Sequence, residues 1–327
     1  MNYHKKMIKQ LLLEYHGSQA DVDDISEYVA NDVFDLFQQY QNNPAILKRL
    51  DNIPFTINLQ KQYSSKIQNV IIILTIANNE QTNITGGFNP KKIKLNDDNE
   101  TYTIEIGIKI KINKSNTENI QDDILAVVSH ELHHAYREIK TLGKKSKERI
   151  YTHARNATNA DMRADYNKHP ELKTFMDMFY LGIQPEIDAR VQETASVLKK
   201  QKLNDTNDYL IYLQRFQPIN DARKMMKYSG NDLKTLDSPV LTNFIHRFNA
   251  NLKYITSIEY DTVKIHTDPG AFIKYWVDRI QERGDNLFKK IMKLIFDKLN
   301  TTFHEAWSSI DLNLLENITD NYYSFGI

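Results

Sequence analysis

A run of alternating isoleucines is the sequence feature that most constrains the fold. From Ile104 to Ile112 every second residue is isoleucine, and charged residues or glycine stand between them. This period of two predicts a β-strand with one buried face and one solvated face. Lys109 and Lys111 on the solvated side are typical of an edge strand, because they discourage pairing with another chain. The fold must therefore contain a sheet with an apolar face.

Three segments before this run also have strand character. Residues 55–59 alternate between apolar and polar side chains, which predicts a strand with one buried face. Residues 70–74 are continuously apolar and rich in β-branched side chains, which predicts a strand covered on both faces. Residues 85–88 and 93–95 together predict another short strand.

Helical periodicity dominates on both sides of this strand region. Two helices are expected within the first 40 residues, and Pro44 ends the second of them. Later helices are expected over residues 122–141, 171–180, 185–200, 207–216, 221–228, 240–254 and 269–299. This order predicts an α+β fold, in which a domain with a small mixed or antiparallel sheet precedes a mainly helical domain. The polar segment 201–208 places the boundary between domains 1–200 and 201–327.

Composition excludes several classes of protein. The chain of 327 residues has no cysteine, which excludes disulfide scaffolds, thiol nucleophiles and cysteine-ligated metal sites. Its 42 basic residues balance 42 acidic ones, so nothing draws the whole chain to nucleic acid or to an anionic membrane. The sequence shows neither a signal-peptide core nor a transmembrane segment, and we expect a cytoplasmic protein.

The strongest chemical signal is a His-Glu-x-x-His pattern made by His130, Glu131 and His134. It lies in a helical stretch whose apolar stripe would dock the helix on the sheet. At about 100° per residue the two histidines are about 40° apart on one helix face, so both imidazoles can reach one ion. Neutral imidazole nitrogens suit Zn²⁺, and a third protein ligand would leave one position for water. The pattern also fits a helix whose histidines merely pack at the edge of the sheet.

A motif of this kind after an amphipathic strand resembles the zincin metallopeptidases, and the resemblance extends over residues 67–198. It implies that a strand edge beside the active-site helix holds a peptide or protein substrate in extended form. It also implies that zinc activates a water molecule and that Glu131 is the catalytic general base. Tyr180 or Arg190 would support the transition state or position the metal ligands.

The third metal ligand distinguishes the subclasses of zincins. Metzincins have glycine and histidine where this chain has Arg137 and Lys140, so that subclass is excluded. Gluzincins use a glutamate from a later helix, often in a Glu-x-x-Ala pattern. Glu186 fits this pattern with Ala189 and lies 52 residues after His134, so the resemblance implies Glu186 as the third ligand.

Other candidates for the third ligand stay open. Glu193 lies two turns after Glu186 on the same helix face and is the main alternative. His153 and His169 are further candidates in segments without a clear pattern. Some gluzincins have aspartate four residues after the ligand glutamate, where this chain has Arg190, which puts the arrangement around the ligands in doubt.

The richness in Asn, Lys, Ile and Tyr resembles the proteins of tailed phages of gut bacteria, the crAss-like group among them. Metallopeptidase-like domains occur there as virion or tail-connector components. This resemblance implies an alternative function, as a structural virion protein such as a tail or portal connector or a ring subunit, with or without activity. The chain would then be located in the virion, with other virion proteins as partners and a possible homo-oligomeric state.

Overall fold

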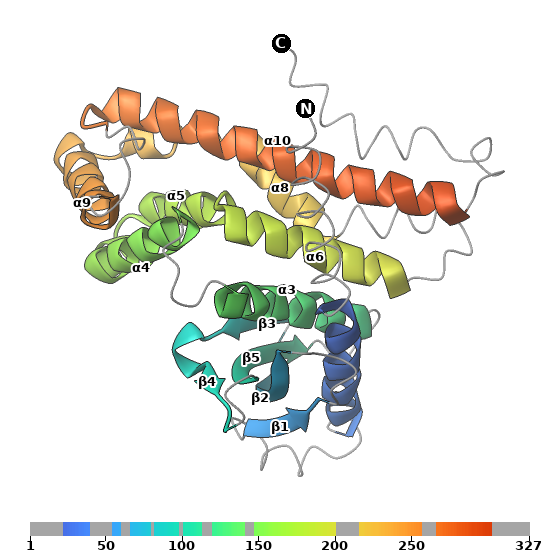
Figure 1. The fold of residues 1–327 in the computed structure, drawn as a ribbon. Helices are drawn as coiled ribbons and strands as arrows, with labels where there is room; N and C mark the ends of the chain where they lie inside the picture. Colours follow the sequence, from blue (N-terminus) through green and yellow to red (C-terminus); the bar gives the residue numbers. More distant parts are fainter. Residues whose placement is uncertain are drawn as a thin grey trace, which may run out of the picture. The chain divides into compact units, whose positions relative to one another are not determined.

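The computed structural model describes residues 22–39, 54–59, 66–79, 82–97, 101–112, 120–140, 147–200, 216–256 and 266–302 (Figure 1). The chain divides into one compact unit of residues 1–143 and 192–201 and another of residues 144–191 and 202–327. Helix α6 (Gln184–Lys200) is continuous, and its residues are divided between the two units. The prediction of a mixed α+β fold is confirmed, and the fold is mostly helical with a small mixed sheet.

Among the described residues, the first unit is built on a five-stranded sheet in which β5 pairs with two strands, β2 and β3, that do not directly precede it in the sequence. The strands are β1 (Pro54–Asn58), β2 (Ile67–Asn78), β3 (Asn83–Phe88), β4 (Lys94–Leu95) and β5 (Tyr102–Ile112). Their order is β1-β2-β5-β3, and β4 also pairs with β5. The β2–β5 pair is parallel, with Val70 opposite Ile104, and the remaining pairs are antiparallel.

Strand β5 is the centre of the sheet, and the prediction of an edge strand is wrong. It pairs with β2 on one side and with β3 and β4 on the other. The prediction of one buried face is confirmed, because Ile104, Ile106, Ile108 and Ile110 are at most 1% exposed while Lys109 is exposed. The lysines mark the solvated face of the strand, whereas strand pairing depends on its backbone edges. Within the described part of the sheet, β3 is the edge strand next to β5.

One face of the sheet carries the core of the first unit. Val70, Ile72 and Leu74 of β2 are buried, but Ile71 and Ile73 are only half-buried, so the prediction of a strand covered on both faces is wrong. The buried residues form one cluster with those of helix α3 (Ile120–Lys140) and of a helix over residues 22–39. In Figure 1, α3 runs alongside β3 and the blue helix over residues 22–39 stands beside the sheet.

The described part of the second unit is helical. Its helices are α4 (Lys147–Tyr166), α5 (Pro170–Leu181), the first half of α6, α8 (Gln217–Lys227), α9 (Ser238–Thr256) and α10 (Pro269–Thr302). Its core is an aromatic cluster, formed by Phe175, Phe179, Phe244, Phe248, Phe272 and Trp276. Most of these ring pairs meet edge to face, which is a preferred geometry for aromatic rings.

Helix α4 is not among the helices predicted from the sequence, and most of its residues are polar. Met162 and Thr158 are buried among its described side chains. The first predicted N-terminal helix lies outside the described residues, as does most of the helix predicted over residues 207–216. No helix in the described ranges combines the length and the apolar character needed to cross a membrane.

Candidate metal centre

Helix α3 supplies the two histidines of the motif. Asp122 and Asp123 in its first turn and Arg137 and Lys140 in its last turn complement the helix dipole. Its apolar stripe, formed by Ile124, Val128, Leu132 and Ala135, is fully buried in the core of the first unit. Because this stripe fixes the rotation of the helix, the face beside it, with the motif histidines, has a defined direction.

The imidazole rings of His130 and His134 converge. Their Nε2 atoms are 3.1 Å apart, and the ring centroids are separated by 4.8 Å at an angle of 71°. His130 is buried at 7% exposure and His134 is half-buried. The i, i+4 spacing therefore brings both ring nitrogens to one point, as the geometry of a helix predicts.

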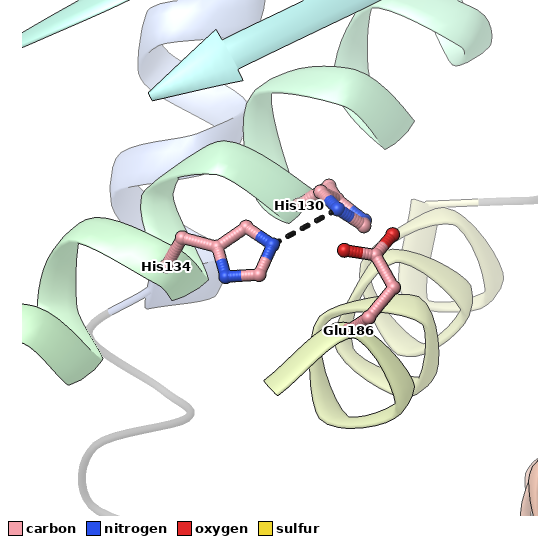
Figure 2. A group of neighbouring side chains, drawn as sticks. All are labelled: His130, His134 and Glu186. Carbon is pink, nitrogen blue, oxygen red and sulfur yellow. Dashed lines mark hydrogen bonds between the residues drawn. The ribbon is translucent and has the colours of Figure 1, made fainter. Parts of the chain in front are cut away.

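Glu186 of α6 completes a group of three potential ligands. A carboxylate oxygen of Glu186 and one ring nitrogen from each of His130 and His134 all lie within 4.8 Å of one another. Figure 2 shows the carboxylate pointing toward the two rings. Glu186 is 1% exposed, so its carboxylate is held away from bulk water. This group could hold a metal ion.

The chemistry of the donors fits a divalent transition metal. Two imidazoles and one carboxylate are ligands that zinc accepts, and other divalent metals accept them too. Ligands on one tetrahedral zinc ion are about 3.4 Å apart, somewhat closer than the 4.8 Å limit of this group.

Glu193 faces the other nitrogen of the His130 ring. Its Oε2 lies 3.2 Å from Nδ1 of His130, and both side chains are buried. Since a carboxylate only accepts, Nδ1 carries the hydrogen and donates it to Glu193. The Nε2 atom of His130 then presents its lone pair toward His134, which is the tautomer that a metal ligand needs. Glu193 therefore orients the His130 ring through Nδ1, while Nε2 of the same ring faces His134. Glu193 does not belong to the group of three.

A buried polar network fixes α6 in the first unit. Ser196 Oγ lies 2.8 Å from Ser129 Oγ on α3. Ser196 and Gln192 also donate to Asp23 Oδ1, at 2.7 Å and 2.5 Å. Burial raises the pKa of Asp23, and the hydrogen bonds from Ser196 and Gln192 partly oppose that rise. These contacts hold the second half of α6 in the first unit.

Glu131 points toward the edge strand of the sheet. The backbone N–H of Phe88 in β3 donates to Glu131 Oε2 at 2.7 Å, and Glu131 is 8% exposed. Within the described residues, β3 has a strand on one side only, where it pairs with β5. The carboxylate of the motif glutamate therefore lies at an open strand edge in the same unit as both histidines.

Gly86 makes this close approach possible. A Cβ atom at residue 86 would lie 2.6 Å from Val127 Cγ1, 2.7 Å from Glu131 Cγ and 2.9 Å from Glu131 Oε1. No side chain other than hydrogen fits there without moving β3 away from α3. The sequence interpretation missed this residue, although a glycine inside a strand pattern is a known sign of close backbone approach.

The two predicted supporting residues have partners in the second unit. Arg190 Nε lies 3.3 Å from Glu186 Oε1, one helical turn away, which makes Arg190 a direct neighbour of the predicted ligand. The Tyr180 ring lies beneath the guanidinium of Arg155, with 3.8 Å between Cζ and the ring centroid. The group of three contains neither residue.

Among the described side chains, His133 and His169 do not belong to the group either. Burial of the His133 ring lowers its pKa to about 3, and the nearby positive charges of His134 and Arg137 contribute to this shift. His133 is therefore neutral at physiological pH. His169 precedes the first turn of α5. His153 belongs to α4, and its side chain lies outside the described residues.

No protein-family model matches this chain, and no curated protein or solved structure is significantly similar to it.

Proposed function

We propose that the chain is a zinc-dependent metallopeptidase with a zincin-like first unit. The observation that supports this proposal most strongly is the convergence of His130, His134 and Glu186 within 4.8 Å. The next residue after His130, Glu131, places a carboxylate at an open strand edge beside the same helix. Metal-assisted hydrolysis of an extended peptide requires three metal ligands, a carboxylate base and a strand edge that can bind the substrate.

Each side chain has a separate role in this proposal. His130, His134 and Glu186 hold the ion, which when bound polarises the scissile carbonyl and lowers the pKa of a coordinated water. Glu193 fixes the tautomer of His130. Glu131 is the general base, and it delivers the proton to the leaving amine. The Phe88 N–H holds one carboxylate oxygen of Glu131 in place, which limits the rotation of the base.

We propose that β3, rather than the isoleucine-rich β5, binds the substrate. The backbone of Gly86 and Gly87 is exposed, and without side chains these residues leave the strand edge accessible. An extended peptide can add to such an edge through main-chain hydrogen bonds. It would then pass directly beside the carboxylate of Glu131.

The proposal is tested with the purified full-length chain and three variants. Metal content is measured by mass spectrometry after dialysis, and hydrolysis is measured on a library of quenched fluorescent peptides. We expect wild-type protein to retain about one zinc per chain and to cleave at least one peptide. Glu131→Gln should keep the zinc and lose at least about 10²-fold in rate, because the amide cannot accept the proton.

Two further variants separate the roles of the side chains. His134→Ala should lose both zinc and cleavage, since it removes one of three ligands. Glu138→Gln lies two turns after Glu131 on the same helix and is the matched control, which should change neither quantity. Wild-type protein without zinc, or equal cleavage by wild type and Glu131→Gln, would rule the proposal out. If the protein bound zinc but cleaved no peptide, the metal would have a structural role only.

A further inference from the structure

Asp221 is a buried carboxylate that the proposed chemistry does not use. It lies on α8 and is 2% exposed, and its neighbours Ile219, Ala222 and Met225 on the same helix are fully buried. A carboxylate in such surroundings is strongly unfavourable unless it is paired. The carboxylate therefore needs a partner that offsets the free-energy cost of its desolvation. The identity of that partner indicates the role of Asp221.

The partners of Asp221 are polar groups of the same unit. Gln217 donates to Asp221 Oδ1 at 2.5 Å, and the Arg190 Nη2 atom lies 3.2 Å from Asp221 Oδ2. Lys224 is 3.9 Å from Oδ1, but its side chain is 59% exposed, so water screens this contact. Arg190 is 19% exposed and is the principal charged partner.

Arg190 makes a second ion pair through a different nitrogen. Its Nε atom lies 3.3 Å from Oε1 of Glu186, while Nη2 faces Asp221. One planar guanidinium thus lies between two carboxylates that are 1% and 3% exposed. A guanidinium can make both contacts because its donors form a rigid fork, whereas a lysine ammonium is a point charge.

The charges of this chain of contacts favour a cation beside Glu186. Arg190 alone would neutralise the Glu186 carboxylate and repel a divalent ion. With Asp221 included, the three side chains have a net charge of about −1, so the local field still attracts a cation.

We propose that Asp221 is a positioning residue for the metal centre and acts on the ligand Glu186 through Arg190. This inference rests on the proposed metal-binding function. It means that a helix of the second unit, more than thirty residues later in the chain, sets the affinity of the metal site. Arg190 is thereby a bridge between the ligand and Asp221, and no contact with a substrate is needed to explain it.

The test measures zinc affinity, in competition with a chromogenic chelator, for a double-mutant cycle of the full-length chain. Asp221→Asn keeps the shape and removes the charge, and it should weaken zinc binding about 10- to 100-fold. In an Arg190→Met background the same change should cost less than about threefold, because its effect passes through the guanidinium. Lys224→Met, which alters the exposed contact of Asp221, is the control and should leave the affinity unchanged.

The outcomes separate this inference from the proposed function. If wild-type protein binds no zinc, both are overturned. If wild type binds zinc and Asp221→Asn binds it equally well, or loses the same factor in both backgrounds, only the role of Asp221 is overturned. If circular dichroism shows that Asp221→Asn does not fold, the zinc affinity of the Arg190→Lys variant tests the inference instead. That variant keeps the charge without the fork and should bind zinc about tenfold more weakly, and an unchanged affinity would overturn the inference.

Discussion

The two units are stabilised by cores of different chemistry. The core of the first unit is aliphatic, with isoleucine, valine and leucine side chains between one sheet face and two helices. The core of the second unit is aromatic, with Phe175, Phe244, Phe248 and Trp276 near its centre. The aliphatic core repeats with the strand period and fixes the rotation of α3, whereas the aromatic core depends on a few large side chains from distant helices.

Both units also bury polar side chains. In the first unit, Ser129, His130, Gln192, Glu193 and Ser196 are buried together at the contact between α3 and the second half of α6, and Glu131 is buried where α3 meets β3. In the second unit Thr158, Glu186, Asp221 and Asn249 are buried, and Asp221 has the ion pair with Arg190 described above.

The largest predicted effect tests the aromatic core. Phe248 is fully buried, and its ring centroid lies 5.2–6.0 Å from those of Phe179, Phe244 and Trp276 among others. Phe248→Ala should lower the free energy of unfolding by about 3–5 kcal/mol, because it removes a large side chain that several rings surround. Urea denaturation followed by tryptophan fluorescence measures this change.

The control for this truncation is Leu95→Ala in the first unit. Leu95 is 50% exposed, so its removal should change the free energy of unfolding by less than about 0.5 kcal/mol. A loss below about 1 kcal/mol for Phe248→Ala would show that the second core does not depend on its central rings.

An intermediate effect is expected where β3 meets α3. Gly86→Ala should cost about 1–3 kcal/mol of unfolding free energy, because the added methyl group overlaps Val127 and Glu131. Gly87→Ala is a matched control, since nothing lies within 4 Å of a Cβ at that residue. Both are measured by urea denaturation, and equal costs for the two variants would contradict the close approach.

The smallest effect concerns the polar network and its dependence on pH. Because burial raises the pKa of Asp23 above 3.8, ionised Asp23 destabilises the fold at neutral pH. Lowering the pH through the folded-state pKa relieves that cost, and the relief is complete below the unfolded-state value. The stability of wild type relative to Asp23→Asn should therefore increase as the pH falls from about 7 to about 4. Chemical denaturation at several pH values measures the difference, and a constant or decreasing difference would be inconsistent with this pKa direction.

Local patterns in the sequence predict local structure well. The period of two identifies the buried face of β5, and the i, i+4 spacing brings His130 and His134 together. The same pattern does not reveal which strands flank β5, because pairing depends on contacts far apart in the sequence. Helix α4 is not predicted, because few of its residues are apolar and a prediction from apolar residues has little to rest on there.

The remaining features of the site depend on how elements pack. Glu186 and Glu193 lie on one face of α6, and their spacing alone does not tell which carboxylate meets which nitrogen of His130. The role of Gly86 becomes clear only when α3 is present beside it. The contact of Arg190 with Asp221 joins residues whose sequence patterns are unrelated.

The continuity of α6 has an evolutionary consequence. Glu186 and Glu193 are seven residues apart on an unbroken helix, which makes almost two whole turns. Inserting or deleting one amino acid between them would rotate one side chain by about 100° relative to the other. We therefore expect related sequences to differ in the types of residue between these two glutamates but to keep the number of residues between them constant.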